Sequence, residues 1–203
     1  MATEIELKLR IVEVHDQDVL LEITKCLALL GLASEFQANE LKNVYFDTAD
    51  WQLNAKKIAL RVRKKGECYI QTLKTKGQSV NGLSRRGEWE WNISEPKLAV
   101  PYLKQCEAWP SSVSPEALVT VFETNFIRYQ IELEWQGAII ELALDQGEIL
   151  SKGRVEKINE LELELLSGNE NCLHLLCIEL RNHISVEPSD ISKAERGYRL
   201  FHQ

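Results

Sequence analysis

The stretch EIELKL, residues 4–9, alternates charged and apolar side chains from its first residue to its last. Successive side chains of an extended strand point to opposite faces, so the charged residues Glu4, Glu6 and Lys8 share one face. The three apolar residues between them share the other face. The stretch therefore predicts an amphipathic strand, and it raises the question of why two carboxylates and an ammonium group gather on one side.

The same alternation recurs along the chain, in stretches separated by turn-forming sequences such as KKGE and TKGQSVNG. This pattern is typical of antiparallel strands with one apolar face. Basic residues gather on the middle strands, and acids gather on the first and later ones. The charged positions with this parity are Arg61, Arg63, Lys74, Lys76, Arg86, Glu88, Glu90, Arg128, Glu132, Glu134, Glu141, Asp145, Glu160, Glu162 and Glu164.

An antiparallel sheet with a solvated face would account for any one of these strands. Across the set, however, charge replaces the serine and threonine of an ordinary solvent face, and its sign is segregated by strand. We therefore predict an α+β fold: an antiparallel barrel of about eight strands with its charged faces inward and its apolar faces outward under helices. A barrel of about eight strands encloses room for one small ligand.

Two longer segments predict helices beside this barrel. Residues 15–31 carry a helical apolar stripe, with Asp16 as the expected N-cap and Gly31 at the C-terminal end. Residues 169–184 predict a second helix with one apolar side.

The other segments are shorter. We expect a helical segment broken by Pro101, a helix that starts at Pro115, and a capped segment over residues 189–201 that closes the chain. No repeat or low-complexity linker interrupts the sequence, so residues 1–203 are interpreted as one domain.

Composition narrows the class of protein. The formal net charge of −7 argues against a general nucleic-acid binder, which would carry excess lysine and arginine. The five cysteines are odd in number and form no C-x-x-C pair, and no signal peptide precedes the first strand, so a cytoplasmic protein with reduced thiols is expected. The four histidines lack zinc-ligand spacing, and no apolar run is long enough to cross a membrane.

Charges of both signs inside one cavity indicate a particular chemistry. Arginine and lysine suit a polyanion, because guanidinium forks match phosphate oxygens and lysine adds a point charge. Rows of carboxylates repel phosphate unless a hard cation such as Mg²⁺ or Mn²⁺ lies between them. The lumen is therefore predicted to bind metal and phosphate together. The phosphate-binding sequence G-x-x-x-x-G-K-[ST] is absent.

The sequence stretches described above resemble those of the CYTH family, the triphosphate tunnel metalloenzymes. EIELKL resembles the E-x-E-x-K opening of that family, and YFDT, LRVRK, TLKTKG, EWEW, IELALDQGE, ELELELLSG and SKAERGY follow in order over the full chain. The last three resemble the bacterial inorganic triphosphatases of the family. In those proteins a helical CHAD domain often follows, so we expect either a stand-alone enzyme or an excised domain.

The resemblance implies a tunnel enzyme that hydrolyses inorganic triphosphate to pyrophosphate and orthophosphate with Mg²⁺ or Mn²⁺. By this resemblance Glu4, Glu6 and Lys8 are the catalytic residues. Arg61, Arg63, Lys74, Arg86, Arg128 and Lys193 are the expected phosphate-binding residues, and the metal set is drawn from Glu4, Glu6, Glu88, Asp145, Glu160, Glu162 and Glu164. The C-terminal pair stays open between Glu160 with Glu162 and Glu162 with Glu164.

Other functions remain possible on the same scaffold. A class IV-type adenylyl cyclase would bind the triphosphate of ATP in the same way but would need a base pocket, and a thiamine triphosphatase would need a thiamine pocket. A non-catalytic polyphosphate-binding module would bind without turnover. In each case the expected partner is a small-molecule triphosphate, with no nucleic acid and no membrane. The sequence leaves the oligomeric state open, and also whether a second metal or a carboxylate activates water.

Overall fold

The computed structural model describes residues 2–12, 18–32 and 35–202. Its elements in chain order are β1 (Ala2–Ile11), α1 (Val19–Leu29), β2 (Gln37–Thr48), α2 (Gln52–Ala55), β3 (Ala59–Lys65), β4 (Cys68–Lys74), β5 (Gln78–Val80), β6 (Leu83–Ile93), α3 (Val100–Gln105), the 3₁₀ turn η1 (Pro115–Ala117), β7 (Leu118–Trp135), β8 (Ala138–Ser151), β9 (Arg154–Ser167), α4 (Asn171–Arg181), β10 (Val186–Pro188) and α5 (Lys193–His202).

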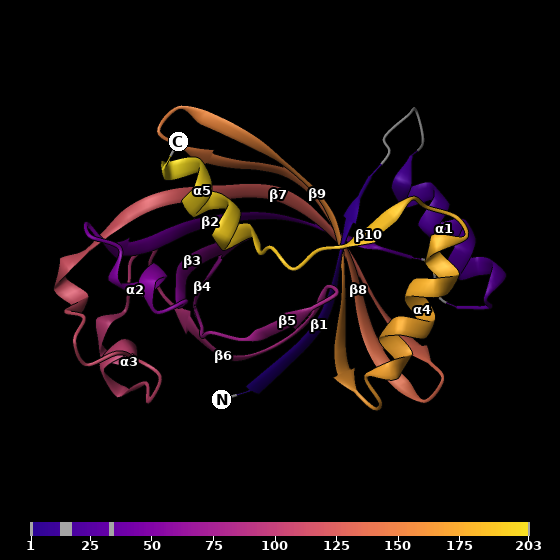
Figure 1. Ribbon diagram of the computed structural model, residues 1–203, viewed down its shortest axis with the longest axis horizontal. Coiled ribbons are helices and arrows are strands. Elements are labelled where there is room, and N and C mark those ends of the chain that lie inside the picture. Colours follow the sequence, from indigo (N-terminus) through magenta and orange to yellow (C-terminus); the bar gives the residue numbers. More distant parts are fainter. Residues whose placement is uncertain (1, 13–17, 33–34, 203) are drawn as a thin grey trace.

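The strands of the described chain form one sheet in the order β10-β1-β9-β8-β7-β2-β3-β4-β6-β5. An additional antiparallel pairing of β1 with β6, from Ala2 opposite Glu88 to Leu7 opposite Leu83, closes eight of these strands into a barrel. The short strands β5 and β10 flank this circuit (Figure 1). The predicted eight-stranded antiparallel barrel of α+β class is therefore confirmed.

Tight hairpins set the register of the longest strands. The turns Gln136–Gly137 and Lys152–Gly153 join β7 to β8 and β8 to β9, and all four residues have positive φ. Two consecutive residues with positive φ are typical of the type I′ turn, whose twist matches that of a hairpin. The resulting register places Arg128 opposite Asp145 and Asp145 opposite Glu160, so these three charges form one row across three strands.

Apolar faces of the barrel pack outward under two pairs of helices. α1 and α4 lie side by side at one end of the molecule, and α2 and α3 lie at the other (Figure 1). Leu9, Ile23 and Leu173 lie in the core under α1 and α4, and Leu60 and Leu103 lie in the core near α2 and α3. All five are fully buried, and each such side chain contributes about 1.5–3 kcal/mol to stability.

A third apolar cluster lies inside the barrel, which the outward orientation of apolar faces did not predict. Phe122, Phe126 and Ile149 have the same strand parity as Arg128 and Asp145, yet they pack against Tyr198 and Leu200 of α5. In this part the lining of the barrel is apolar rather than charged. The physical reason is that α5 packs against the inner face of the sheet and needs an apolar surface to bury its own apolar side.

Several predicted helix boundaries shift. The N-cap of α1 is Asp18, whose carboxylate accepts a hydrogen bond from Leu21 N at 3.2 Å, and the expected cap Asp16 lies outside the described residues. Pro101 does not break its helix, because it lies in the first turn of α3, where its missing N–H costs nothing. Pro115 begins only the short turn η1, and β7 follows directly.

Candidate active site

The barrel encloses a charged cavity of about 260 Å³. Its lining includes Glu4, Glu6, Lys8, Arg61, Arg63, Lys74, Arg86, Glu88, Arg128, Glu162, Glu164 and Lys193. The other two predicted site residues, Asp145 and Glu160, are buried beside it and contact lining residues. The strand register thus brings all the predicted site residues together.

The N-terminal acids form one half of the charge network. Glu4 accepts hydrogen bonds from Lys74 Nζ at 2.5 Å and Arg86 Nε at 2.7 Å, and Glu6 Oε1 accepts from Arg86 Nη2 at 3.2 Å. Lys8 Nζ lies 3.0 Å from Glu6 Oε1. Burial would raise the pKa of Glu4, but the charges of Lys74 and Arg86 outweigh it and hold that pKa well below its usual range. Glu4 is therefore a carboxylate at neutral pH.

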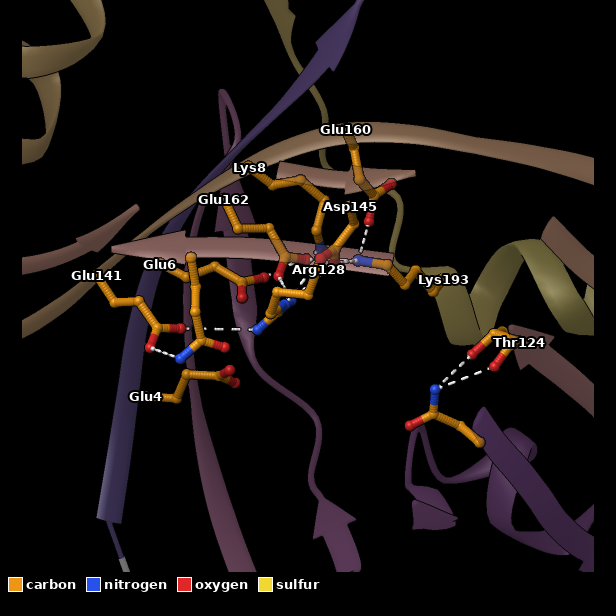
Figure 2. A network of polar contacts seen from close by, with 12 residues as sticks. Glu4, Glu6, Lys8, Thr124, Arg128, Glu141, Asp145, Glu160, Glu162 and Lys193 are labelled. Atoms are coloured by element: carbon orange, nitrogen blue, oxygen red, sulfur yellow. Dashed lines mark hydrogen bonds and ion pairs between the residues drawn. The ribbon is translucent and has the colours of Figure 1, made fainter. Parts of the chain in front are cut away.

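The second half surrounds the row of charges on β7, β8 and β9 (Figure 2). Arg128 forms a fork with Asp145, with Nε–Oδ1 and Nη2–Oδ2 distances of 2.8 and 2.7 Å, and its Nη2 lies 2.5 Å from Glu162 Oε2. Lys193 Nζ lies 2.7 Å from Asp145 Oδ2 and 2.9 Å from Glu162 Oε1, and it also pairs with Glu160. Each of these three acids thus contacts Arg128, Lys193 or both.

The ionisation of this second cluster follows from its burial and its opposite charges. Burial opposes the charged form of Asp145, yet Arg128 and Lys193 hold its pKa below the usual value. Burial likewise opposes the charged form of Lys193, but the surrounding acids raise its pKa well above the usual value. Asp145 and Lys193 therefore both stay charged near neutral pH, and each requires its partners to remain buried.

The two arginines of β3 differ from the cations described so far. The ion pair of Arg61 with Glu90 spans 4.0 Å, and Arg61 Nε is buried without a hydrogen-bond partner among the described residues. Arg63 Nε donates to Asn43 Oδ1 at 2.7 Å, a neutral acceptor. Burial would raise the pKa of Tyr45, but the charge of the neighbouring Arg61 lowers it. Neither of these two arginines is therefore held by a hydrogen bond to a carboxylate among the described residues.

Glu164 lies apart from the acids of the second cluster. In the sheet it lies opposite Glu6 on β1 and opposite Glu141 on β8. Burial, reinforced by the charge of Glu4, raises the pKa of Glu164 to about 7. The sequence left open whether Glu162 pairs with Glu160 or with Glu164. In the structure the carboxylate oxygens of Glu160 and Glu162 converge near Asp145, whereas Glu164 does not belong to this group.

Some functional contacts were not found from the sequence. Tyr45 lines the cavity, and the buried Asn43 lies on the same face of β2. Their alternation in KNVYFDT could have indicated this, but neither carries the charge that marked the other strands. On α5, Arg196 binds Glu156 and Glu160 at 2.6 and 3.0 Å. Its spacing of three residues from Lys193 places both on one helix face, which was the available signal.

The remaining charged residues with the strand parity of the site residues fall into two groups. Glu90 and Glu141 line the cavity. Lys76, Glu132 and Glu134 are exposed and lie outside it, so alternation alone did not distinguish lumen from barrel end.

The residues present fit a divalent cation. Asp145, Glu160 and Glu162 each offer a carboxylate oxygen, and these oxygens lie within 4.8 Å of one another. Carboxylate oxygens are the ligands that Mg²⁺ and Mn²⁺ prefer. Glu4 and Glu6 line the cavity that Glu162 also lines, although Arg86 now binds both of them.

Fold and site together define a class: a closed antiparallel β-tunnel whose lumen holds opposed rows of carboxylates and cations. The CYTH domain model matches residues 2–198, and the chain belongs to the CYTH family. It is 35% identical over 204 residues to an inorganic triphosphatase of Haemophilus influenzae, covering 98% of this chain. The chain spans 55% of the length of that relative.

Solved structures share the fold. A candidate adenylyl cyclase from Hippeastrum, described as having a dominant triphosphatase activity, matches with a TM-score of 0.69 and 22% identity, covering 97% of this chain and 95% of that one. A candidate adenylate cyclase from Bacillus halodurans matches with a TM-score of 0.57 and 21% identity, covering 97% and 98%. Among the helices that the structure describes, none has the length and apolar character needed to cross a membrane.

Proposed function

We propose that this protein hydrolyses inorganic triphosphate to pyrophosphate and orthophosphate inside the tunnel. The observation that carries this proposal is the pair of β3 arginines, Arg61 and Arg63, which line the charged cavity and form no hydrogen bond with a carboxylate among the described residues. A compact polyanion is the ligand that such a pair binds best, because guanidinium groups contact phosphate oxygens in pairs. The similarity to an inorganic triphosphatase supports the same substrate.

The other cations extend this binding surface. Lys8, Lys74, Arg86, Arg128 and Lys193 line the same cavity, and each is now paired with an acid. Phosphate oxygens of a bound triphosphate would compete for these donors. Fixed cations around the leaving pyrophosphate would stabilise the charge that develops there, which is how phosphoryl transfer is generally accelerated.

The acids suit a divalent metal, and we propose Mg²⁺ or Mn²⁺. Asp145, Glu160 and Glu162 would hold it, with Glu4, Glu6 and Glu88 facing the same lumen, and the Glu160–Glu162 register is favoured by the convergence of these oxygens. A bound metal would neutralise phosphate oxygens beside the carboxylates and lower the pKa of a bound water. The ion pairs that Lys193 and Arg128 form with these acids would weaken if a metal were bound there.

The cellular setting follows from the same features. All five cysteines are free thiols in the structure, which suits a reducing compartment. We therefore place the protein in the cytoplasm, acting on a small-molecule substrate.

The test is orthophosphate release from inorganic triphosphate in Mg²⁺, Mn²⁺ or EDTA, with ATP and thiamine triphosphate in parallel. A Glu4→Ala/Glu6→Ala variant removes two lumen acids. A matched Glu132→Ala/Glu134→Ala variant removes two acids from exposed positions outside the cavity. We expect metal-dependent release that is lost in the first variant, retained in the second, and fastest with triphosphate.

Other outcomes would contradict the proposal in distinct ways. Cyclic AMP formed from ATP, with no release from triphosphate, would identify a cyclase. Preferred hydrolysis of thiamine triphosphate would change the substrate. Thermal stabilisation by triphosphate without any turnover would indicate a binding module.

A further inference from the structure

Asn43 lies fully buried in β2, between the strands that carry Arg63 and Thr124. In the sheet it is directly opposite Arg63 on β3 and directly opposite Thr124 on β7. The three residues therefore form one row across three neighbouring strands. Thr124 is also fully buried.

Hydrogen bonds fix the orientation of the Asn43 amide. Its Nδ2 donates to Thr124 O at 3.1 Å and to Thr124 Oγ1 at 3.0 Å, as Figure 2 shows at Thr124. A backbone carbonyl oxygen can only accept a hydrogen bond, so the amide nitrogen must face Thr124. The amide oxygen is then turned toward Arg63, whose Nε donates to it at 2.7 Å.

The partner of Arg63 leaves its positive charge in place. Arg86 and Arg128 are held by carboxylates, which orient them but also neutralise them. Arg63 forms no ion pair with the acids that the structure describes. Burial, together with repulsion from Arg61 and Arg128, lowers the pKa of Arg63 to about 9. A bound anion would therefore stabilise the charged form of this guanidinium.

The hydrogen bond also leaves the far end of Arg63 available. Asn43 occupies Nε, and Arg63 lines the charged cavity. The two terminal amino groups of the guanidinium can then contact phosphate oxygens as a fork. A carboxylate in place of the Asn43 amide would hold Arg63 but cancel its charge, and an apolar residue would leave the charge but not hold it.

We propose that Asn43, anchored by Thr124, is a positioning residue that orients Arg63 toward bound triphosphate without neutralising it. The inference rests on the proposed function, and it assigns a specific role to an uncharged residue outside the predicted charged set. Asn43 acts only through Arg63, so its effect on substrate affinity must disappear when the guanidinium is absent.

The experiment is a double-mutant cycle with Asn43→Ala, Arg63→Met and the double variant. Triphosphate affinity is measured by calorimetry in EDTA, and KM and kcat for triphosphate are measured with Mg²⁺. We expect each single variant to weaken triphosphate binding by about 10-fold or more, the effect of losing a hydrogen bond or contact made by a charged group. We expect the double variant to bind no more weakly than Arg63→Met alone, and kcat to change less than KM.

Further variants separate positioning from general loss of structure. Asn43→Asp should weaken triphosphate binding as much as Arg63→Met does, because the new carboxylate would cancel the charge of Arg63 while keeping the shape of the Asn43 side chain. Thr124→Val should raise the KM for triphosphate, whereas Thr124→Ser, which keeps the hydroxyl acceptor, should have a KM close to that of the unmodified protein. This pair of variants tests the proposal even if Asn43→Ala fails to fold. Asn159→Ala is the matched control, because Asn159 accepts from Gln146 on β8 at an exposed contact of 3.3 Å.

The outcomes are distinguishable. Coupling between Asn43 and Arg63 in triphosphate affinity, with rescue by Thr124→Ser, supports the proposal. Additive losses in the double variant, or unchanged affinity in both Asn43→Ala and Thr124→Val, overturn it. Failure of the unmodified protein to bind or hydrolyse triphosphate would overturn the proposed function, and this inference with it.

Discussion

Most of the cations that line the tunnel are neutralised by neighbouring acids. Arg128 and Lys193 each contact more than one acid, and Arg86 bridges Glu4 and Glu6. Buried ion pairs of this kind contribute little net stability, because desolvation offsets the attraction between the charges. We therefore propose that these ion pairs serve ligand binding, in which phosphate and metal would take the places of the internal partners.

At residue scale the first prediction concerns Glu6. Glu6→Gln keeps the shape of the side chain but removes the charge that faces Lys8 and Arg86. We expect turnover to fall by about 10- to 100-fold, as when the support of a metal site is lost. Triphosphate affinity in EDTA should change far less, because the cations remain. Orthophosphate release and calorimetry measure the two quantities, and an equal loss in both would remove Glu6 from the catalytic set.

The second residue-scale prediction concerns Arg61. Arg61→Ala removes a guanidinium whose Nε has no hydrogen-bond partner among the described residues. We expect the KM for triphosphate to rise by about 10- to 100-fold, the range for lost hydrogen bonds to a charged ligand. Steady-state kinetics with triphosphate measure it. An unchanged KM would show that Arg61 does not hold phosphate.

At the scale of elements, α5 connects the tunnel to the rest of the fold. It carries Lys193 into the charged cluster, and further along it Tyr198 donates a hydrogen bond to the buried Asp47 at 2.8 Å. Asp47 also accepts from the backbone N–H groups of Leu53 and Asn54 at the start of α2, at 2.8 and 2.9 Å. One carboxylate thus ties β2, α2 and α5 together, and it helps hold Lys193 in register.

Gly197 provides the prediction at this scale. A Cβ added at Gly197 would overlap the ring of Phe122, so Gly197→Ala must push α5 away from β7. Helix propensity favours alanine by about 0.8–1 kcal/mol, but overpacking of a buried site costs about 1–3 kcal/mol. We expect a net loss of stability in urea unfolding, together with lower triphosphatase activity because Lys193 moves with the helix.

The control for this prediction is Arg199→Ala, an exposed position on the same helix. It should leave both unfolding and activity close to those of the unmodified protein. Greater stability in Gly197→Ala would mean that α5 does not depend on close packing against Phe122.

At the scale of the whole molecule, closure of the sheet is the decisive feature. The β1–β6 pairing brings the first strand of the chain against a strand about 80 residues later, and β1 also pairs with β9. Side chains from distant segments therefore share one lumen, and a ligand inside it would contact several strands of the barrel. Binding should consequently stabilise the fold as a unit.

The prediction for the whole molecule is a ligand-dependent melting temperature. At a triphosphate concentration about 100 times its dissociation constant, binding adds about 2.7 kcal/mol of stability. For a chain of this size we expect the melting temperature to rise by about 5–10 °C. Thermal unfolding of the Glu6→Gln variant avoids substrate turnover during the measurement. The absence of any rise would argue against triphosphate as a ligand of the tunnel.

The sequence by itself determined most of the barrel strands and, where charges alternate with apolar residues, which face of the strand is charged. Alternation such as Glu4, Glu6, Lys8 or Arg61, Arg63 depends only on the two-residue period of a strand, which is a local property. The barrel and the charged lumen could be predicted from that period together with the segregation of charge. The single-domain interpretation of residues 1–203 stays a prediction.

Only the tertiary structure decided which charges meet and where the charged lumen ends. The row Arg128–Asp145–Glu160 depends on hairpin register, and the convergence of Glu160 and Glu162 near Asp145 separates them from Glu164. Contacts of this kind join residues far apart in the chain, and a residue such as Asn43 carries no charge that would mark it. The apolar part of the lumen likewise depends on where α5 packs, because the same alternation can bury either face.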